Sequence, residues 1–279
     1  MSLTRSIAKN TAYLTIGKII STVLGVITVA LLLRYLSPDD YGRYTTAIAF
    51  VLLLGTVTDF GLNLTTTQDI SLPNTDTAKT LSSVFTFRLL ANIVLAALLP
   101  FILNWFPYEP VVKQAILILT VLFFSTTLFQ VLASYFQSTL EAGKVAVADL
   151  SGKIALFVLT VLAVAWRFSF NEIMLTISLS ALLQLWLLIH FLNKKITLKL
   201  SIDWAIWKRI MAKTWPIAVS VVLTTIYFKG DTLVMSLTRS YEDVGIYGAA
   251  YKILEVLISL PILFMGLVLP QLARSFGEG

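Results

Sequence analysis

The sequence contains no cysteine, which excludes disulfide bonds and thiolate-ligated metal sites. His190 is the only histidine, and a lone histidine near the end of an apolar segment is typical of a membrane-interface anchor, not of a metal ligand or proton relay. The motifs G-x-x-x-x-G-K-[ST], H-E-x-x-H and G-x-S-x-G are missing, and no hydrophilic stretch is long enough for a soluble active-site domain. We therefore expect no metal, no cofactor and no enzymatic activity.

Charged residues are also scarce. They make up 13% of the chain against 57% hydrophobic residues, and the mean hydropathy is +0.86. A soluble domain of 279 residues cannot bury so many apolar side chains. Eight stretches approach the roughly 20 apolar residues that a membrane span needs, and they are found at roughly 10–33, 44–65, 84–104, 114–136, 150–166, 172–192, 214–237 and 245–269. We predict an all-α polytopic membrane protein with eight transmembrane helices.

The positive charges are distributed unevenly between the ends of these predicted spans. When Lys and Arg are assigned to alternate sides, thirteen fall on the side of the N-terminus and five on the other. The positive-inside rule then places the N-terminus in the cytoplasm of a multi-pass protein of the inner (plasma) membrane. The excess of Lys and Arg on the cytoplasmic side therefore explains the net charge of +6, and no nucleic-acid partner is expected. Because only two cations precede the first span and no small-residue cleavage site is visible, we expect a retained helix instead of a signal peptide.

One short motif occurs twice. Asp40-Tyr41-Gly42-Arg43-Tyr44 returns 203 positions later as Asp243-Val244-Gly245-Ile246-Tyr247. Each copy lies between two predicted spans on the same side of the membrane, which is typical of a parallel internal repeat. The glycine of each copy is expected to allow a tight turn, and the tyrosine that ends it to lie at headgroup depth.

The repeat also predicts the domain organisation. A second copy that starts at the seventh span implies a unit of six spans, so residues 1–193 form a complete N-terminal six-helix lobe. Residues 194–213 gather six cations beside apolar residues at helical spacing, and they are expected to form a cytoplasmic amphipathic helix that links two lobes. Residues 214–279 would then be the first two helices of a second, truncated lobe.

Ionisable side chains inside the predicted spans are the candidate site residues. They are Lys18, Asp59, Arg88, Lys153, Lys229, Asp231, Lys252 and Glu255. Such groups are costly in a bilayer unless they pair with each other or contact water. Two interpretations stay open, structural ion pairs between helices or the lining of a polar cavity. Asp149, four residues before Lys153, is expected to form a surface salt bridge with it.

Several motifs in a fixed order carry a resemblance to a known family. They are Asn10-Thr11, the hairpin from Leu33 to Tyr44, Asp59-Phe60-Gly61-Leu62, Gly230-Asp231 and the run from Val244 to Ile253. With these the sequence resembles the polysaccharide biosynthesis and O-antigen type flippases of the multidrug/oligosaccharidyl-lipid/polysaccharide (MOP) superfamily. The resemblance implies a MATE-like fold, with two six-helix lobes around a central cavity. Because the family usually has more spans than the eight predicted, we expect this chain to be a fragment that cannot transport by itself.

The resemblance also implies a function and partners. Such proteins translocate polyprenyl-diphosphate-linked oligosaccharides from the cytoplasmic to the outer leaflet by alternating access, and a polysaccharide polymerase or other assembly proteins would be partners beside membrane lipids. Lys18, Arg88 and Lys153 in the cytoplasmic half favour an anion such as a lipid diphosphate. The alternatives are a MATE-like cation-coupled drug antiporter, which would need unpaired carboxylates, and a non-transporting membrane scaffold. The glycan and the coupling ion, sodium or proton, stay open.

Overall fold

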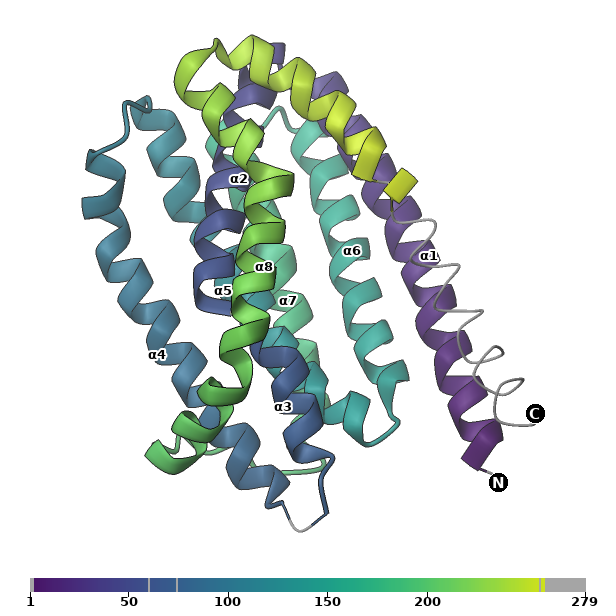
Figure 1. Cartoon of the computed structure of the whole chain (residues 1–279). Helices are drawn as coiled ribbons and strands as arrows, with labels where there is room; N and C mark the ends of the chain where they lie inside the picture. The colour runs from purple at the N-terminus through teal and green to yellow at the C-terminus, as the bar shows by residue number, and fades with distance from the viewer. Residues whose placement is uncertain (1–2, 60, 74, 256, 259–279) are drawn as a thin grey trace, which may run out of the picture.

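The computed structural model describes residues 3–59, 61–73, 75–255 and 257–258, and within these ranges all regular structure is helical. Side chains are described for residues 16–56, 61–73, 75–255 and 257–258. The helices, drawn in Figure 1, are α1 (Leu3–Tyr35), α2 (Pro38–Asp59), α3 (Leu62–Ile70), α4 (Thr77–Asn104), α5 (Pro110–Ser138), α6 (Ala142–Ala165), α7 (Phe170–Asn193) and α8 (Trp204–Thr238). A further helical segment, 241–255, follows α8.

Six of the helices in the described part of the chain are long and apolar enough to cross a membrane. Their spans are Ile16–Tyr35, Thr77–Asn104, Pro110–Ser138, Ala142–Ala165, Phe170–Asn193 and Trp204–Thr238. The prediction of an all-α multi-pass architecture is therefore confirmed, whereas the predicted number of eight spans is not.

The predicted span 44–65 is wrong as a single helix. The chain breaks between α2 and α3, where Gly61 adopts a left-handed conformation with φ of 77°. A side chain at this position would be strained, and its Cβ would lie 2.6 Å from Cγ2 of Ile217 in α8. The glycine therefore ends α2 and lets α3 start in a new direction against α8.

The predicted linker 194–213 also differs from the structure. Residues 196–203 are not helical, and the helical part of the linker is continuous with the following span as α8. Asp203 starts this helix as its N-cap, because its Oδ1 accepts hydrogen bonds from the backbone N–H groups of Ala205 (3.0 Å) and Ile206 (3.1 Å). Ile206 and Ile210 are buried in the core, so the apolar face of this segment packs against the bundle as the first part of α8 and not as a separate helix.

The bundle is built around α5, which packs against α2, α3, α4 and α7, while α6 packs against α1 and α7. A buried hydrogen bond of 2.9 Å between the hydroxyls of Tyr108 and Ser236 ties the start of α5 to the end of α8. In Figure 1 the segment after α8 crosses α2 and then runs beside α1. This places the second copy of the repeat against the first.

The two copies of the repeat form the same local structure. Ser37 Oγ accepts a hydrogen bond from the backbone N–H of Asp40 (3.1 Å), and Ser240 Oγ accepts one from Asp243 (3.2 Å). These serines are themselves 203 positions apart, and each caps the helix that follows it. The expectation that the glycines form the turns is wrong, because the turns lie at residues 36–37 and 239–240 and Gly42 and Gly245 lie within helices.

Candidate functional site

A cavity of about 390 Å³ lies between α1, α6 and α7 on one side and the 241–255 segment on the other, with α2 at one end. We call it the main cavity. Its polar lining consists of Lys18, Ser21, Thr22, Thr28, Tyr44, Asp149, Lys153, Lys252 and Glu255. Four of the eight candidate site residues, Lys18, Lys153, Lys252 and Glu255, are thus brought together from three separate parts of the chain.

The α1 and α6 side of the main cavity carries two lysines. Lys18 is exposed on α1, and Lys153 is partly buried on α6. Lys153 lies within electrostatic reach of Asp149, Lys18 and Lys252. Among the side chains that the structure describes, no carboxylate forms an ion pair with either Lys18 or Lys153. Their positive charges are therefore available to a ligand in the cavity.

Asp149 is the charged residue of this lining that was not among the candidate site residues. It was expected to form a surface salt bridge with Lys153, but its Oδ1 instead accepts a 3.0 Å hydrogen bond from Nε2 of Gln184 in α7. The spacing of Asp149 and Lys153 placed them on one face of a helix, yet nothing in the sequence showed which neighbour that face meets. The amide of Gln184, in the apolar stretch of α7 between Ser180 and His190, was the available signal.

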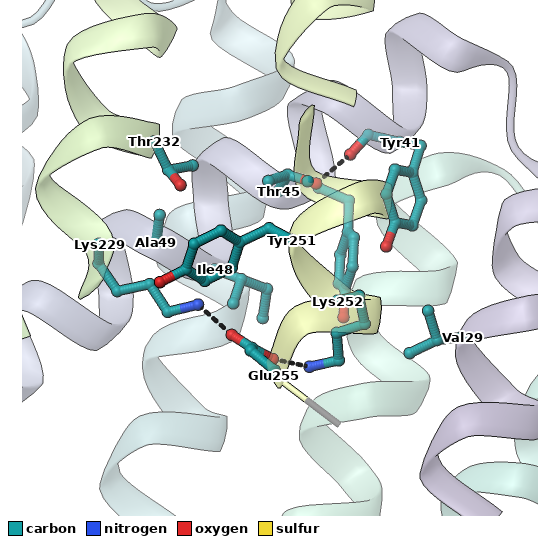
Figure 2. Close-up of a pocket in the computed structure, with 12 residues that line it drawn as sticks. Val29, Tyr41, Thr45, Ile48, Ala49, Lys229, Thr232, Tyr251, Lys252 and Glu255 are labelled. Atoms are coloured by element: carbon teal, nitrogen blue, oxygen red, sulfur yellow. Dashed lines mark hydrogen bonds and ion pairs between the residues drawn. The ribbon is translucent and has the colours of Figure 1, made fainter. Parts of the chain in front are cut away.

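A second cavity of about 50 Å³ adjoins the main one between α2, α8 and the 241–255 segment, and Figure 2 shows its lining. The two cavities share Val29, Tyr44, Lys252 and Glu255. The Glu255 carboxylate lies between two ammonium groups, accepting a hydrogen bond from Lys229 and another, 2.7 Å long, from Lys252. The Lys229 ammonium also lies 4.9 Å from the ring centre of Tyr251.

This arrangement combines the two interpretations that the sequence left open. Lys229, Lys252 and Glu255 are ion-paired, and all three line a cavity. Asp231 lines neither cavity, and its carboxylate accepts a hydrogen bond from the Tyr247 hydroxyl. The pairing thus links α8 to the segment that follows it, while Lys252 still faces the main cavity.

Arg88 and Asp59 are placed differently. Arg88 is fully buried in α4, a helix that packs against α5, α8, α3 and α2, and it lines neither cavity. One turn further on, Asn92 donates a 3.0 Å hydrogen bond to Thr127 in α5. The side chain of Asp59 lies outside the described residues. We expected Lys18, Arg88 and Lys153 to act together on an anion. In the structure Lys18 and Lys153 line the main cavity, whereas Arg88 does not.

The family model described as "Polysaccharide biosynthesis protein" matches residues 7–276. The chain belongs to the polysaccharide biosynthesis protein family. No curated protein matches it.

Two solved structures share the fold of this family member. One, described as a structure of the "MATE multidrug transporter DinF-BH" in complex with a ligand, aligns with a TM-score of 0.72 at 13% identity over 96% of the chain. The other, described as "protein A", aligns with a TM-score of 0.67 at 14% identity over 99% of the chain. The chain spans 65% and 66% of these two structures, respectively. The expected MATE-like fold is therefore confirmed over nearly the whole chain.

Proposed function

We propose that this polysaccharide biosynthesis family member is a membrane flippase for polyprenyl-diphosphate-linked oligosaccharides. It would move them from the cytoplasmic to the outer leaflet by alternating access, for O-antigen, capsule or exopolysaccharide synthesis. The observation that carries the proposal is the main cavity, where Lys18 and Lys153 of the N-terminal helices face Lys252 of the second repeat. A ligand bound by these three side chains would contact both parts that move in an alternating-access carrier.

The charge of the two cavities supports an anionic ligand. Four lysines, Lys18, Lys153, Lys229 and Lys252, line them together with two carboxylates, Asp149 and Glu255. The formal excess of two positive charges matches a diphosphate. Hydrogen bonds between ammonium groups and phosphate oxygens are charge-assisted, and each contributes about 1.5–3 kcal/mol.

The drug-antiporter alternative is less consistent with these contacts. The similar MATE structure is described as a multidrug transporter with a bound ligand, and its likeness to this chain extends to the fold. A cationic drug would need a free carboxylate in the cavity. Asp149 accepts a hydrogen bond from the neutral amide of Gln184 and so keeps its charge, but Glu255 is paired with two lysines, and the four lysines of the cavities outnumber the two carboxylates. A scaffold that does not transport would need no polar cavity inside the membrane.

Orientation and partners follow from the same proposal. The thirteen-to-five distribution of positive charges supports an N-terminus in the cytoplasm and a location in the inner membrane. A lipid-linked glycan would enter from the cytoplasmic leaflet, where it is assembled, and leave toward a polymerase or another assembly protein. The coupling ion stays open.

The function is tested by glycan export in cells whose own flippase has been deleted, with the variants made in a protein that carries both predicted lobes. Lys153→Ala and Lys252→Ala should each lose export while reaching the membrane at normal abundance, because they remove a phosphate contact and not a core side chain. Lys208→Ala is the matched control, since Lys208 is an exposed lysine of α8 outside both cavities. Normal export by both cavity variants would overturn the proposed function.

A further inference from the structure

The two copies of the internal repeat touch each other through their glycines. A Cβ added to Gly42 in α2 would overlap the carbonyl oxygen of Tyr241, and a Cβ added to Gly245 would overlap the carbonyl oxygen of Pro38. Tyr241 is 203 positions after Pro38, as Gly245 is after Gly42. The two contacts are therefore equivalent: the glycine of each copy packs against the carbonyl at the start of the other copy.

The contact continues for one more helical turn. A Cβ added to Gly248 would lie 2.5 Å from Cγ2 of Thr45, and these two residues are again equivalent positions of the repeat. The helices α2 and 241–255 thus cross about a local two-fold axis, with Gly-x-x-Thr on one helix against Gly-x-x-Gly on the other. Small residues at such a crossing allow the backbones to approach closely.

This crossing lies at one end of both cavities. Tyr41, Tyr44, Thr45 and Gly248 at the crossing form part of the lining of the smaller cavity. The lining continues one turn further with Ile48 and Ala49 on α2 and with Tyr251 and Lys252 on the second helix. Figure 2 shows Tyr41 and Thr45 of α2 above the ion pairs of Glu255. The glycine crossing therefore separates the cavities from the end of the bundle that carries the turns at 36–37 and 239–240 (Figure 1).

Side chains around the crossing complete the closure. Tyr41 and Val244, which are also equivalent positions of the repeat, are both buried beside the glycines. The Arg43 guanidinium lies 5.4 Å from the ring centre of Tyr241 and pairs with Glu109 at 3.0 Å. Between the smaller cavity and this end of the bundle thus lie the backbones at the crossing, the buried Tyr41 and Val244, and the partly buried Arg43 and Tyr241.

We propose that the Gly42–Gly245 crossing is the gate that closes the transport cavity toward the membrane face where the two turns lie. The inference rests on the proposed function for the movement of a substrate, although the gate itself can be tested without one. A methyl group at either glycine would clash with a main-chain carbonyl, which cannot rotate away as a side chain can. When the gate opens, α2 and the 241–255 helix move apart. A Cβ at either glycine would hold these two helices apart and so keep the gate open.

The test uses a single cysteine as a reporter, because the chain has none of its own. Val29→Cys places it on α1, at the lining that both cavities share. A membrane-impermeant thiol reagent is applied to vesicles of both orientations. Two single-cysteine variants identify the exposed face: Asp39→Cys marks the face of the turns and Lys194→Cys the opposite face. Both side chains are exposed. With the native glycines, Val29→Cys should be protected from the face of the turns.

Adding Gly42→Ala or Gly245→Ala should abolish that protection, so that Val29→Cys is labelled from the face of the turns. Gly230→Ala is the matched control, because its Cβ would make an ordinary 3.5 Å contact with Ile226. Unchanged protection in both glycine variants would overturn the gate. If transport is absent but the labelling changes as expected, the proposed function fails and the gate stands.

A disulfide provides a second test if the alanine variants do not reach the membrane. A Cβ at Gly248 would lie 3.1 Å from Cβ of Thr45, close to the separation of about 3.8 Å in disulfides. In the double variant Thr45→Cys/Gly248→Cys, the threonine methyl is absent. The new side chain at position 248 therefore does not clash with it, as it would in Gly248→Cys alone. Oxidation should cross-link the pair and stop glycan export until a reductant is added. Continued export by the cross-linked protein would overturn the gate.

Discussion

The carboxylate of Asp69 in α3 and the guanidinium of Arg209 in α8 form an ion pair 2.6 Å long, and Lys213 pairs with the other carboxylate oxygen at 2.7 Å. Asp69 is only 2% exposed, whereas both cations are about half exposed. The short helix after the Gly61 break is therefore fastened to α8 by a buried carboxylate. Next to it, a buried 2.7 Å hydrogen bond joins the hydroxyls of Thr65 and Thr214.

Asp69→Asn should lower the free energy of unfolding by about 1–3 kcal/mol, because two charge-assisted hydrogen bonds are weakened while the released cations stay partly hydrated. Thermal unfolding of the purified protein in detergent measures the loss. Asp39→Asn is the control, since Asp39 is an exposed acid of α2 and forms no ion pair with any side chain that the structure describes. Equal stability of the two variants would contradict this role for Asp69.

Gly61→Ala should destabilise the protein by about 1–3 kcal/mol, because alanine is strained at a positive φ. Its methyl would also press on Ile217, so the α2–α3 break and the contact with α8 should both be disturbed. Gly25→Ala is the comparison, since a Cβ at Gly25 meets nothing within 4 Å. Equal melting temperatures for the two variants would show that the break does not depend on glycine.

The turn between α5 and α6 should contribute a pH-dependent stability. Hydrogen bonds from Lys144 (2.6 Å) and then Lys195 (2.8 Å) lower the pKa of Glu141 below its ordinary value of 4.5. Because the folded-state pKa is lowered, the contribution is fully present above the unfolded pKa and is lost as the pH falls through the folded one. The stability difference between the native protein and Glu141→Gln should therefore be largest near neutral pH and shrink in acid. A difference that grows in acid would contradict the assignment.

The same pair behaves in the opposite sense at high pH. Hydrogen bonding to Glu141 raises the pKa of Lys195, so its contribution is present below the unfolded pKa of lysine and is lost as the pH rises through the raised value. Lys195→Met should therefore cost stability at neutral pH but not in strong alkali. Unfolding curves across the alkaline range measure this dependence, and a constant difference would exclude the pair as its cause.

Glu255→Gln should tighten binding of a diphosphate lipid. The glutamate neutralises Lys229 and Lys252, so its removal leaves more positive charge for the ligand, and a gain of about 1.4 kcal/mol would be a tenfold lower Kd. Titration of nanodisc-embedded protein with a polyprenyl diphosphate measures the change. If the folded variant binds the lipid more weakly, the prediction is wrong. Glu255 would then contact the substrate or position the lysines that do, and it would not compete with the diphosphate for them.

The architecture could be read from the sequence in large part, because long apolar segments and a repeated motif are local signals. The break at Gly61 was not predicted, although Asp59 and Asn63 interrupt the apolar run there, since nothing in the local sequence shows that a glycine is left-handed. The true start of α8 could have been found from Asp203, an N-cap residue before an apolar helical pattern, yet the cations around it favoured a surface helix. Both errors concern where helices begin and end, which depends on single residues.

The site was less predictable, because a cavity depends on which helices are neighbours. Depth along a helix selected Lys18 and Lys153, which line the main cavity, but it also selected Arg88, which is buried in α4 and does not line it. The glycines illustrate the same limit. Their repetition was visible, whereas the fact that Gly42 and Gly245 pack against each other required the tertiary structure.

The most direct test of the account is the affinity of the protein in nanodiscs for a polyprenyl diphosphate, for the uncharged polyprenol of equal length, and for a lipophilic cation of similar size. The account predicts that the native protein prefers the diphosphate and that Lys18→Ala/Lys153→Ala/Lys252→Ala loses this preference, because these lysines supply the charge of the main cavity. Preferential binding of the cation by the native protein, or an undiminished preference for the diphosphate in the triple variant, would contradict it.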